Sequence, residues 1–314
     1  MSIYRTLKGY NIKSVTSDPA NTKEGQIWYN DTSNKIRVNT IKPATWASGG
    51  NYPATAHGIQ GDGTQTAAFA AGGSADTDET NEYNGSSWTA GNNMGTARYT
   101  FGANGSQTAG LAFGGYNPGT AGNIVNVEEY DGTNWAEQNN LPAATQQNTG
   151  CGTQTAALKF GGSPDAGTDE YDGTSWTAGG DMNTARYAMA GAGTQTAALA
   201  AGGHLGDNTA SNSTNSEEYN GSAWTEGNDI NTSRKDFSGS GIQTLALVFG
   251  GDGITATEQY NGTSYTATAA LSTGRRLGAG AGTGQLALYS AGQPTNSTEE
   301  FTDITNAVTS LDVS

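Results

Sequence analysis

Few residues in this chain could do chemistry, and their spacing does not favour a catalytic or metal centre. His57 and His204 are the two histidines, and neither has a cysteine or histidine neighbour. Cys151 is the single cysteine, so no disulfide within the chain and no cysteine-based zinc cluster can form. A copper centre of two histidines, two tyrosines and a cysteine would need Cys151 to converge with histidines from other segments. The sequence therefore predicts no metal and no cofactor.

Carboxylates and arginines recur at fixed positions instead of standing alone. Paired glutamates precede an aromatic residue at Glu128-Glu129, Glu217-Glu218 and Glu299-Glu300. No acid pair stands apart from this recurring set, so we predict no enzyme activity. Four arginines each follow an aromatic residue by ten positions, and they are Arg98, Arg186, Arg234 and Arg275. Two roles stay open for them: a ring that faces a ligand around a central funnel, or hydrogen bonds to loop carbonyls between adjacent blades of a repeat fold.

These residues belong to a repeat of 28 residues. Trp176–Gly203 reads WTAGGDMNTARYAMAGAGTQTAALAAGG, and Trp88–Gly115 is identical to it at 17 of 28 positions. Further copies of the same length are Trp46–Gly73, Trp135–Gly162, Trp224–Gly251 and Tyr265–Gly292. Copies of equal length indicate a repeat architecture, whose elements must position every residue named above.

Each repeat is expected to form four short antiparallel strands in a meander. In one copy we expect strands at Trp176–Ala178, Tyr187–Ala192 and Ala197–Ala201, with a tight turn at Gly193–Thr196. A further strand ends in Tyr before an Asn-Gly or Asp-Gly pair, the preferred residues of two-residue hairpin turns. Only the distance from the second glycine of Gly-Gly to this tyrosine, which is Phe301 in the last repeat, varies between repeats: it is 10, 15, 9, 16, 9 and 9 residues. A four-stranded repeat of this length is typical of a propeller blade.

The sequence between Trp46 and about Phe301 resembles the kelch repeat. The resemblance rests on four features in order: a strand ending in Gly-Gly, then Glu-x-Tyr or Glu-Glu-Tyr, then a Trp, and then an Arg before the next strand. Two residues depart from this pattern, because Tyr265 replaces a Trp and Thr145 replaces an Arg. The resemblance implies an all-β, six-bladed kelch-like β-propeller with four antiparallel strands per blade. Because the repeats begin at an outer strand and end at a third strand, we expect the Trp46 strand to close the ring.

We expect three segments: a docking arm at 1–45, the propeller at 46–302 and a C-terminal tail at 303–314. In the arm, Glu24–Tyr29 and Lys35–Asn39 alternate apolar and polar residues around a turn-rich Asn30–Asn34, which predicts a small N-terminal β-hairpin. Residues 1–42 carry seven basic and three acidic side chains, a net +4, so the rest of the chain's net −15 is −19. An acidic body disfavours nucleic-acid binding. No secretory signal and no apolar run long enough for membrane insertion is visible.

The segment EGQIWYNDTSNKIRV, residues 24–38, resembles a short module of phage tail-fibre and other virion appendage proteins. The near-identical Gly-Thr-Gln-Thr-Ala stretches resemble kelch-like proteins of marine bacteriophages. The resemblance implies a bacteriophage virion structural protein, as a tail fibre, tail or capsid appendage, assembled in the host cytoplasm. Its arm would dock on other virion proteins through Trp28, Tyr29, Lys35 and Arg37. A kelch-type protein-interaction scaffold and a glycan-acting enzyme stay open as alternatives, although the chain shows neither an adaptor domain nor non-repeated catalytic residues.

Two long loops, Tyr116–Asn126 and His204–Ser216, predict a recognition face. Variable loops on a rigid scaffold are where binding usually resides. We expect a host-surface glycan or protein to bind there for adhesion, and the alternative is that both loops are tolerated insertions. The expected contact residues are Tyr116, Asn117, His204, Asp207, Arg98, Arg186, Arg234 and Arg275.

Overall fold

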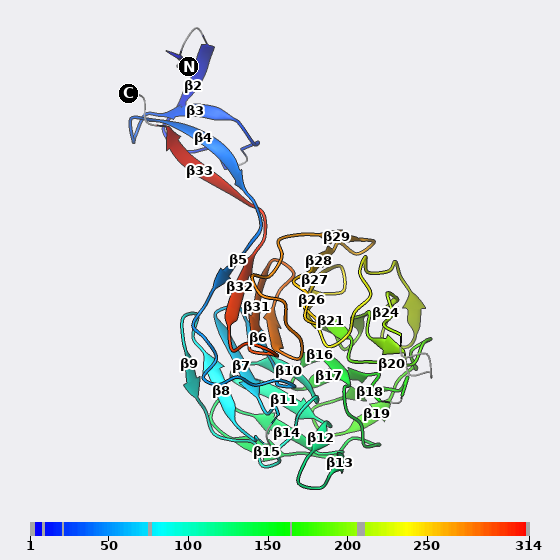
Figure 1. The fold of residues 1–314 in the computed structure, drawn as a ribbon. Coiled ribbons are helices and arrows are strands. Elements are labelled where there is room, and N and C mark those ends of the chain that lie inside the picture. Colours follow the sequence, from blue (N-terminus) through cyan, green and yellow to red (C-terminus); the bar gives the residue numbers. More distant parts are fainter. Residues whose placement is uncertain are drawn as a thin grey trace. The chain divides into compact units, whose positions relative to one another are not determined.

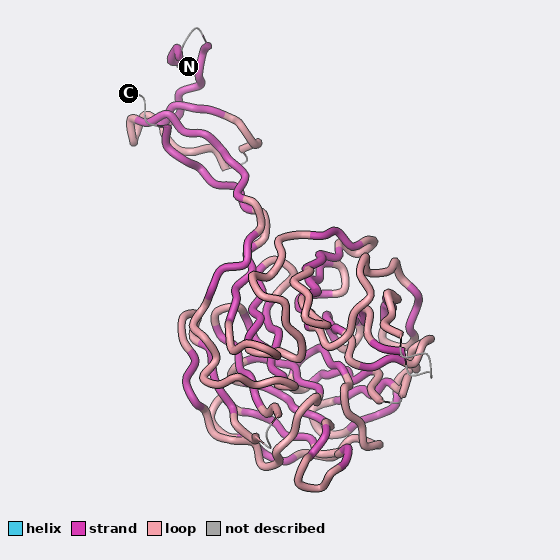
Figure 2. The backbone as a smooth tube through the Cα atoms, viewed as in Figure 1, coloured by secondary structure: helices cyan, strands magenta, loops and turns pink. Residues whose placement is uncertain are grey.

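The computed structural model describes residues 4–7, 10–20, 22–74, 77–163, 165–205 and 211–311. This described part consists of strands and loops without a helix (Figure 2). Accordingly, no helix in it is long and apolar enough to cross a membrane. The chain divides into two compact units. We call Met1–Thr45 with Thr302–Ser314 the terminal unit and Trp46–Phe301 the repeat body.

In the terminal unit, the described strands form one five-stranded sheet in the order β1-β2-β3-β4-β33. Its strands are β1 (Tyr4–Leu7), β2 (Tyr10–Val15), β3 (Ile27–Asn30), β4 (Lys35–Lys42) and β33 (Thr305–Leu311). Strands β3 and β4 pair antiparallel from Asn30 opposite Lys35, which confirms the predicted hairpin. Trp28 is 1% exposed and donates its indole N–H to Asp18 Oδ1 at 2.8 Å, so it anchors the core of this sheet.

The expected C-terminal tail is instead part of this sheet. Strand β33 pairs along β4 from Thr305 opposite Lys42 to Leu311 opposite Ile36. The second edge of β4 would otherwise present unpaired N–H and C=O groups, and pairing with β33 satisfies them. The expectation of a separate tail at 303–314 is therefore wrong.

The described residues of the repeat body form six four-stranded sheets (Figure 1). The first three are β6 (Gln60–Thr64), β7 (Ala67–Ala71), β8 (Thr80–Tyr83) and β9 (Trp88–Ala90); β10 (Gly102–Ser106), β11 (Ala109–Phe113), β14 (Val127–Tyr130) and β15 (Trp135–Glu137); and β16 (Thr149–Thr153), β17 (Ala156–Phe160), β18 (Thr168–Tyr171) and β19 (Trp176–Ala178). The next two are β21 (Ala190–Thr194), β22 (Ala197–Ala201), β24 (Ser216–Tyr219) and β25 (Trp224–Glu226); and β26 (Ser238–Ile242), β27 (Leu245–Phe249), β28 (Thr257–Tyr260) and β29 (Tyr265–Ala267).

The sixth sheet joins both ends of the repeat body. Its strands are β30 (Ala279–Gly282), β31 (Leu286–Ser290), β32 (Thr298–Thr302) and β5 (Thr45–Ser48). Trp46 on β5 donates its indole N–H to Thr257 Oγ1 of the fifth sheet at 3.1 Å. Its ring packs against Phe249 and Phe301, with centroids 5.2 and 5.3 Å away. Two short strand pairs lie outside the six sheets: β12 (Tyr116–Asn117) with β13 (Gly122–Asn123), and β20 (Arg186–Tyr187) with β23 (His204–Leu205).

The first strand of each sheet begins later than the sequence suggests. We expected a strand at Tyr187–Ala192, but β21 covers Ala190–Thr194. The reason is Ala188, whose φ of 54° is left-handed and interrupts an extended strand. Small residues then let neighbouring first strands approach closely: a Cβ on Gly191 would lie 2.5 Å from Thr149 Cγ2 of the preceding sheet.

Aromatic residues fill the space between sheets. Trp224 packs on Phe160 of the preceding sheet, with ring centroids 5.0 Å apart, and on Tyr219 of its own sheet at 5.1 Å. Tyr219 is completely buried, yet its hydroxyl donates to Glu170 of the preceding sheet at 2.6 Å. These rings bury apolar area and carry a polar atom that reaches the preceding sheet, which suits a core otherwise built from alanine and glycine.

Candidate functional site: the central cavity and its mouth

A cavity of about 260 Å³ lies where the six sheets meet. The first strand of every sheet lines it, namely β6, β10, β16, β21, β26 and β30. Neighbouring first strands contact one another in chain order, and β30 contacts β6. The lining holds no lysine, arginine or histidine among the described residues. Its chemistry is therefore set by glycine, small polar side chains and two carboxyl groups.

Six residues form a hydrogen-bonded ring beside this cavity, and we call them the mouth ring. Each stands twelve positions after the aromatic residue of its repeat: Gly58, Thr100, Gln147, Ala188, Asp236 and Leu277. All six have left-handed backbones, with φ between 50° and 71°. All except Gly58 line the cavity. The same twist at the same repeat position places the six peptide groups in equivalent surroundings.

Each mouth-ring N–H donates to the carbonyl oxygen of the mouth-ring residue one repeat earlier. For example, Thr100 N donates to Gly58 O at 2.8 Å, and Gln147 N donates to Thr100 O at 2.6 Å. The series returns to its start, because Gly58 N donates to Leu277 O at 2.7 Å. The remaining bonds, from Ala188, Asp236 and Leu277, are 2.8 to 2.9 Å long.

Polar atoms without partners point to the mouth as a site. Asn148 follows a mouth-ring residue and lines the cavity, and it is only 5% exposed. Neither its Oδ1 nor its Nδ2 has a hydrogen-bond partner among the described residues. The same holds for Thr100 Oγ1, on a residue 8% exposed, and for Asp236 Oδ1. Buried polar atoms are normally paired, so these atoms have hydrogen-bonding capacity that the described residues do not use.

Two carboxyl groups line the cavity, and burial raises the pKa of both. Burial raises the pKa of Asp62 to about 7, against the lowering effect of N–H donation from Gly63 and Gly105. Burial also raises the pKa of Asp236, although Lys235 and Arg276 nearby act in the opposite direction. The cavity therefore disfavours additional negative charge. No group of three or more His, Cys, Asp or Glu residues in the described part could hold a metal ion.

Side-chain pairs flank the mouth ring. Tyr99 precedes Thr100 and packs against Tyr116 with the rings tilted and their centroids 5.2 Å apart. Tyr187 precedes Ala188 and stacks on His204 at 4.8 Å. At the equivalent position elsewhere, Ser74 Oγ lies 3.0 Å from His57 Nδ1, and Arg276 donates to Gln293 Oε1 at 3.1 Å. The flanking surface thus changes from aromatic to charged around the cavity.

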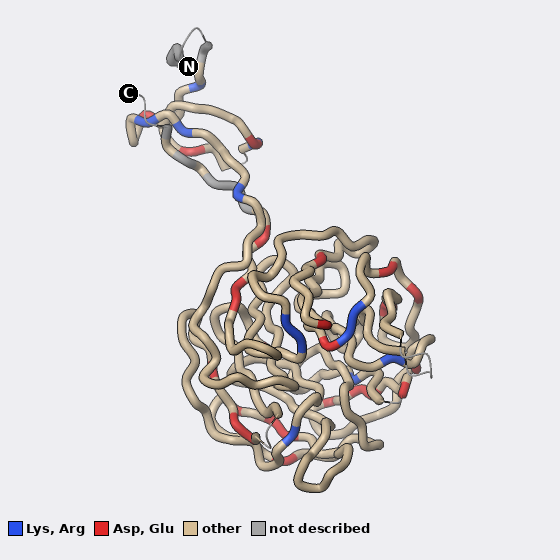
Figure 3. Tube along the Cα trace, in the orientation of Figure 1, with Lys and Arg blue, Asp and Glu red and all other residues tan. Residues whose placement is uncertain are grey.

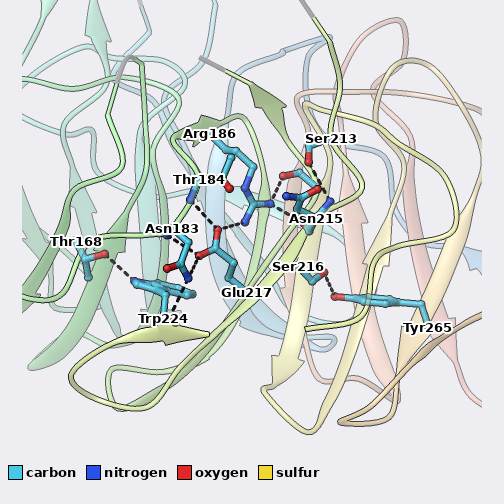
Figure 4. A network of polar contacts seen from close by, with 11 residues as sticks. Thr168, Asn183, Thr184, Arg186, Ser213, Asn215, Ser216, Glu217, Trp224 and Tyr265 are labelled. Atoms are coloured by element: carbon cyan, nitrogen blue, oxygen red, sulfur yellow. Dashed lines mark hydrogen bonds and ion pairs between the residues drawn. The ribbon is translucent and has the colours of Figure 1, made fainter. Parts of the chain in front are cut away.

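The four repeat arginines do not face a ligand, which corrects that hypothesis. Arg98, Arg186, Arg234 and Arg275 are all completely buried. Each pairs with a glutamate of the four-stranded sheet that follows it in the chain: Glu128, Glu217, Glu258 and Glu299, respectively. Arg186 also donates to the carbonyls of Gly202 and Asn215, each at 2.6 Å (Figure 4). The arginines thus satisfy carboxylates and carbonyls inside the fold.

The remaining expected contact residues fall into three groups. Tyr116 and His204 lie beside the mouth ring in the aromatic pairs. Asn117 turns its side chain into its own loop, where Oδ1 accepts from the N–H groups of Gly119 and Thr120. Asp207 lies outside the described residues.

The expected docking residues are used largely within the terminal unit. Trp28 is buried, so it cannot meet a partner, and this corrects its assignment. Tyr29 donates to Asn34 Oδ1 at 3.2 Å. Arg37 donates to Ser310 Oγ at 2.9 Å. Lys35 is exposed.

The mouth ring, Asn148 and Asp62 were not predicted from sequence, although a signal exists. When the six repeats are aligned on their aromatic residue through the residue after Gly-Gly, they span 29 positions. Only the mouth-ring position carries a different residue in all six repeats. Residues that pack one sheet on the next are nearly constant among the repeats. A position that differs in every repeat is therefore one whose residue type is not fixed by this packing.

Comparison with known proteins addresses the fold. No family model matches the chain, and no curated protein matches its sequence. The solved structure of YjhT, a kelch-like β-propeller type of fold, superposes with a TM-score of 0.65 at 13% identity. The match covers 85% of this chain and 100% of YjhT. The chain has a β-propeller-like fold. At this identity the similarity concerns the fold alone.

Proposed function

We propose that the repeat body is a closed six-bladed propeller. Four kinds of contact recur between consecutive sheets, although not all four occur at every junction, and each kind also links the first sheet to the sixth. Gly58 N bonds Leu277 O, Tyr83 Oη donates to Glu300, and Trp88 Nε1 donates to Thr298 Oγ1 at 2.9 Å. Gln65 Nε2 donates to the carbonyls of Ala287 and Phe301. These bonds support closure because an open row of sheets would leave them unmade.

We propose that this propeller is a recognition domain of a bacteriophage virion appendage, displayed for host adhesion. The recognition role rests on a difference between constant and variable positions of the repeat. The constant Arg, Tyr, Trp and Gln side chains mostly make bonds within and between sheets, whereas variable polar residues border the cavity. Binding suits this arrangement better than catalysis, since the cavity lining offers two isolated carboxyl groups and no basic side chain among the described residues.

The virion part of the proposal rests on the terminal unit. Residues 24–38 resemble appendage modules, and the basic residues 1–42 contrast with the acidic remainder, where Lys and Arg are sparse (Figure 3). Lys35 and the 42%-exposed Ile27 and Ile41 remain for contact with another virion protein.

The test is incorporation into particles. Mass spectrometry of purified virions should detect the chain, and a variant lacking residues 1–45 should be absent from them. Normal incorporation of that variant would contradict docking through the arm. Absence of the full chain from virions would contradict the virion role altogether.

A further inference from the structure

We propose that the mouth ring and Asn148 bind a single neutral sugar residue at the mouth of the central cavity. This inference rests on the recognition role proposed above and names the chemistry of the ligand.

The first argument is retained backbone strain. A left-handed backbone is relaxed only for glycine, and other residues there cost about 1–3 kcal/mol each. Gly58 shows that glycine fits the mouth ring, yet five repeats keep a side chain. Thr100, with φ of 50°, is β-branched and therefore especially unfavourable. Since the six residues differ in size and polarity, sheet packing does not explain them, and the side chains serve what they face, which is the cavity.

The second argument is the hydrogen-bonding capacity at the mouth. Asn148 offers an unpaired donor and an unpaired acceptor, Thr100 offers a hydroxyl, and Asp236 offers an unpaired Oδ1. A ligand must therefore both donate and accept at short spacing. Sugar hydroxyl groups do both, and amides, carboxylates and hydroxyls can pair with them. Leaving such atoms unsatisfied costs stability, so a matched ligand gains affinity from them.

The third argument concerns charge and size. Asp62 and Asp236 line the cavity without any basic residue in the described lining, so the lining itself offers no counter-charge to an acidic sugar. The volume of about 260 Å³ lies just below the roughly 300–1,000 Å³ of sites for drug-sized ligands. One sugar ring suits this space better than an oligosaccharide. Ala188 and Leu277 add apolar surface for the C–H face of the ring.

The experiment uses the full chain and free monosaccharides. Glucose, galactose, mannose and N-acetylglucosamine are titrated by calorimetry and ligand-detected NMR, with N-acetylneuraminate as the acidic probe. At least one neutral sugar should bind, and the acidic sugar should not. Thr100→Gly, Gln147→Gly and Asp236→Gly each keep the left-handed backbone and remove the side chain.

These glycine variants separate a binding role from a structural one. Each should bind the sugar about tenfold more weakly or worse, while its melting temperature stays equal or rises because strain is relieved. Asn148→Ala should also weaken binding. Ala121→Gly is the matched control, since Ala121 has φ of 52° but is exposed and outside the cavity lining. It should leave the affinity unchanged.

Three results would overturn the inference: no binding of any neutral sugar, binding of N-acetylneuraminate alone, or glycine variants that bind as tightly as the parent. None of them bears on virion incorporation, which is measured on particles. A chain present in virions without sugar affinity would contradict only this inference. Sugar binding by a chain absent from virions would contradict only the virion role.

Discussion

At the scale of single residues, the buried ion pairs change in matched sets. The repeat that has Ala56 in place of arginine has Asn81 in place of the glutamate. The repeat that has Thr145 has Asp169 instead, and Lys159 supplies its cation at 3.3 Å. A buried charge without its partner is strongly destabilising, so one partner is not replaced without a change in the other.

We expect Arg186→Ala to lower the free energy of unfolding by about 3–5 kcal/mol, because Glu217 would stay buried and lose its cation. The double variant Arg186→Ala/Glu217→Asn copies the Ala56 repeat and should recover part of this loss. Guanidinium unfolding of the three proteins measures the coupling. Arg276→Ala is the control: this half-exposed arginine should cost no more than about 1 kcal/mol. Equal losses for Arg186→Ala and Arg276→Ala would contradict the buried-pair account.

Asp62 gives a pH-dependent prediction. Its folded-state pKa of about 7 lies above the unfolded value of about 3.9, so the folded protein binds this proton more tightly. This contribution to the free energy of unfolding is therefore present below about pH 4 and is lost as the pH rises to 7. Asp62→Asn should remove it, which unfolding at several pH values would detect as a difference from the parent.

Asp18 is the control for Asp62, because its contribution to the free energy of unfolding changes with pH in the opposite direction. Hydrogen bonds from Asn30 and Trp28 lower the pKa of Asp18 in the terminal unit. Its contribution is present at neutral pH and is lost as the pH falls. If Asp62→Asn leaves the pH dependence unchanged, or shifts it in the direction expected for Asp18→Asn, burial of Asp62 is not the cause.

At the scale of elements, turn residues and alternation predicted most strands but missed those set by distant partners. Trp176–Ala178 and Ala197–Ala201 agree with the structure because local turns bound them. Strand β33 was missed because its partner edge on β4 lies far away in the sequence. The start of each first strand was missed because residues such as Gln147 carry no signal for a left-handed backbone. Of the two roles left open for the arginines, hydrogen bonding to carbonyls is observed, but their glutamate partners were missed because spacing does not show which carboxylate a side chain will meet.

Deleting residues 304–314 should destabilise the terminal unit and not the repeat body. Strand β4 would lose its β33 neighbour and expose its hydrogen-bonding groups. Hydrogen exchange should show lost protection of β4 amides and unchanged protection in β7 and β22. Ser310→Ala removes only the acceptor of Arg37 and should change stability by at most about 0.5 kcal/mol. Unchanged β4 protection in the deletion variant would show that β33 contributes nothing.

At the scale of the whole molecule, closure makes a prediction about truncation. Deleting residues 1–45 keeps most of β5, whereas deleting residues 1–56 removes it and leaves β32 as an open edge. We expect the shorter deletion to melt cooperatively near the temperature of the parent repeat body. The longer deletion should melt lower, because the Trp46 bond to Thr257 and the β32 pairing are lost. If both melt cooperatively at the same temperature in calorimetry, closure through β5 is refuted.

The sixth sheet differs from the other five in the aromatic residue of its third strand. Every earlier third strand ends in a tyrosine that bonds a glutamate on the preceding sheet, but here Phe301 has no hydroxyl, and the preceding sheet presents Gln259. Gln259 instead donates to Gly284 O at 2.8 Å. Near-identical repeats are prone to assemble in the wrong order. A sheet carrying Phe301 that docked elsewhere would leave a glutamate without its donor, and a tyrosine sheet in its place would face an amide. This junction therefore differs chemically from the others, and we expect sheets that dock in a wrong order to lose side-chain hydrogen bonds that the observed order makes.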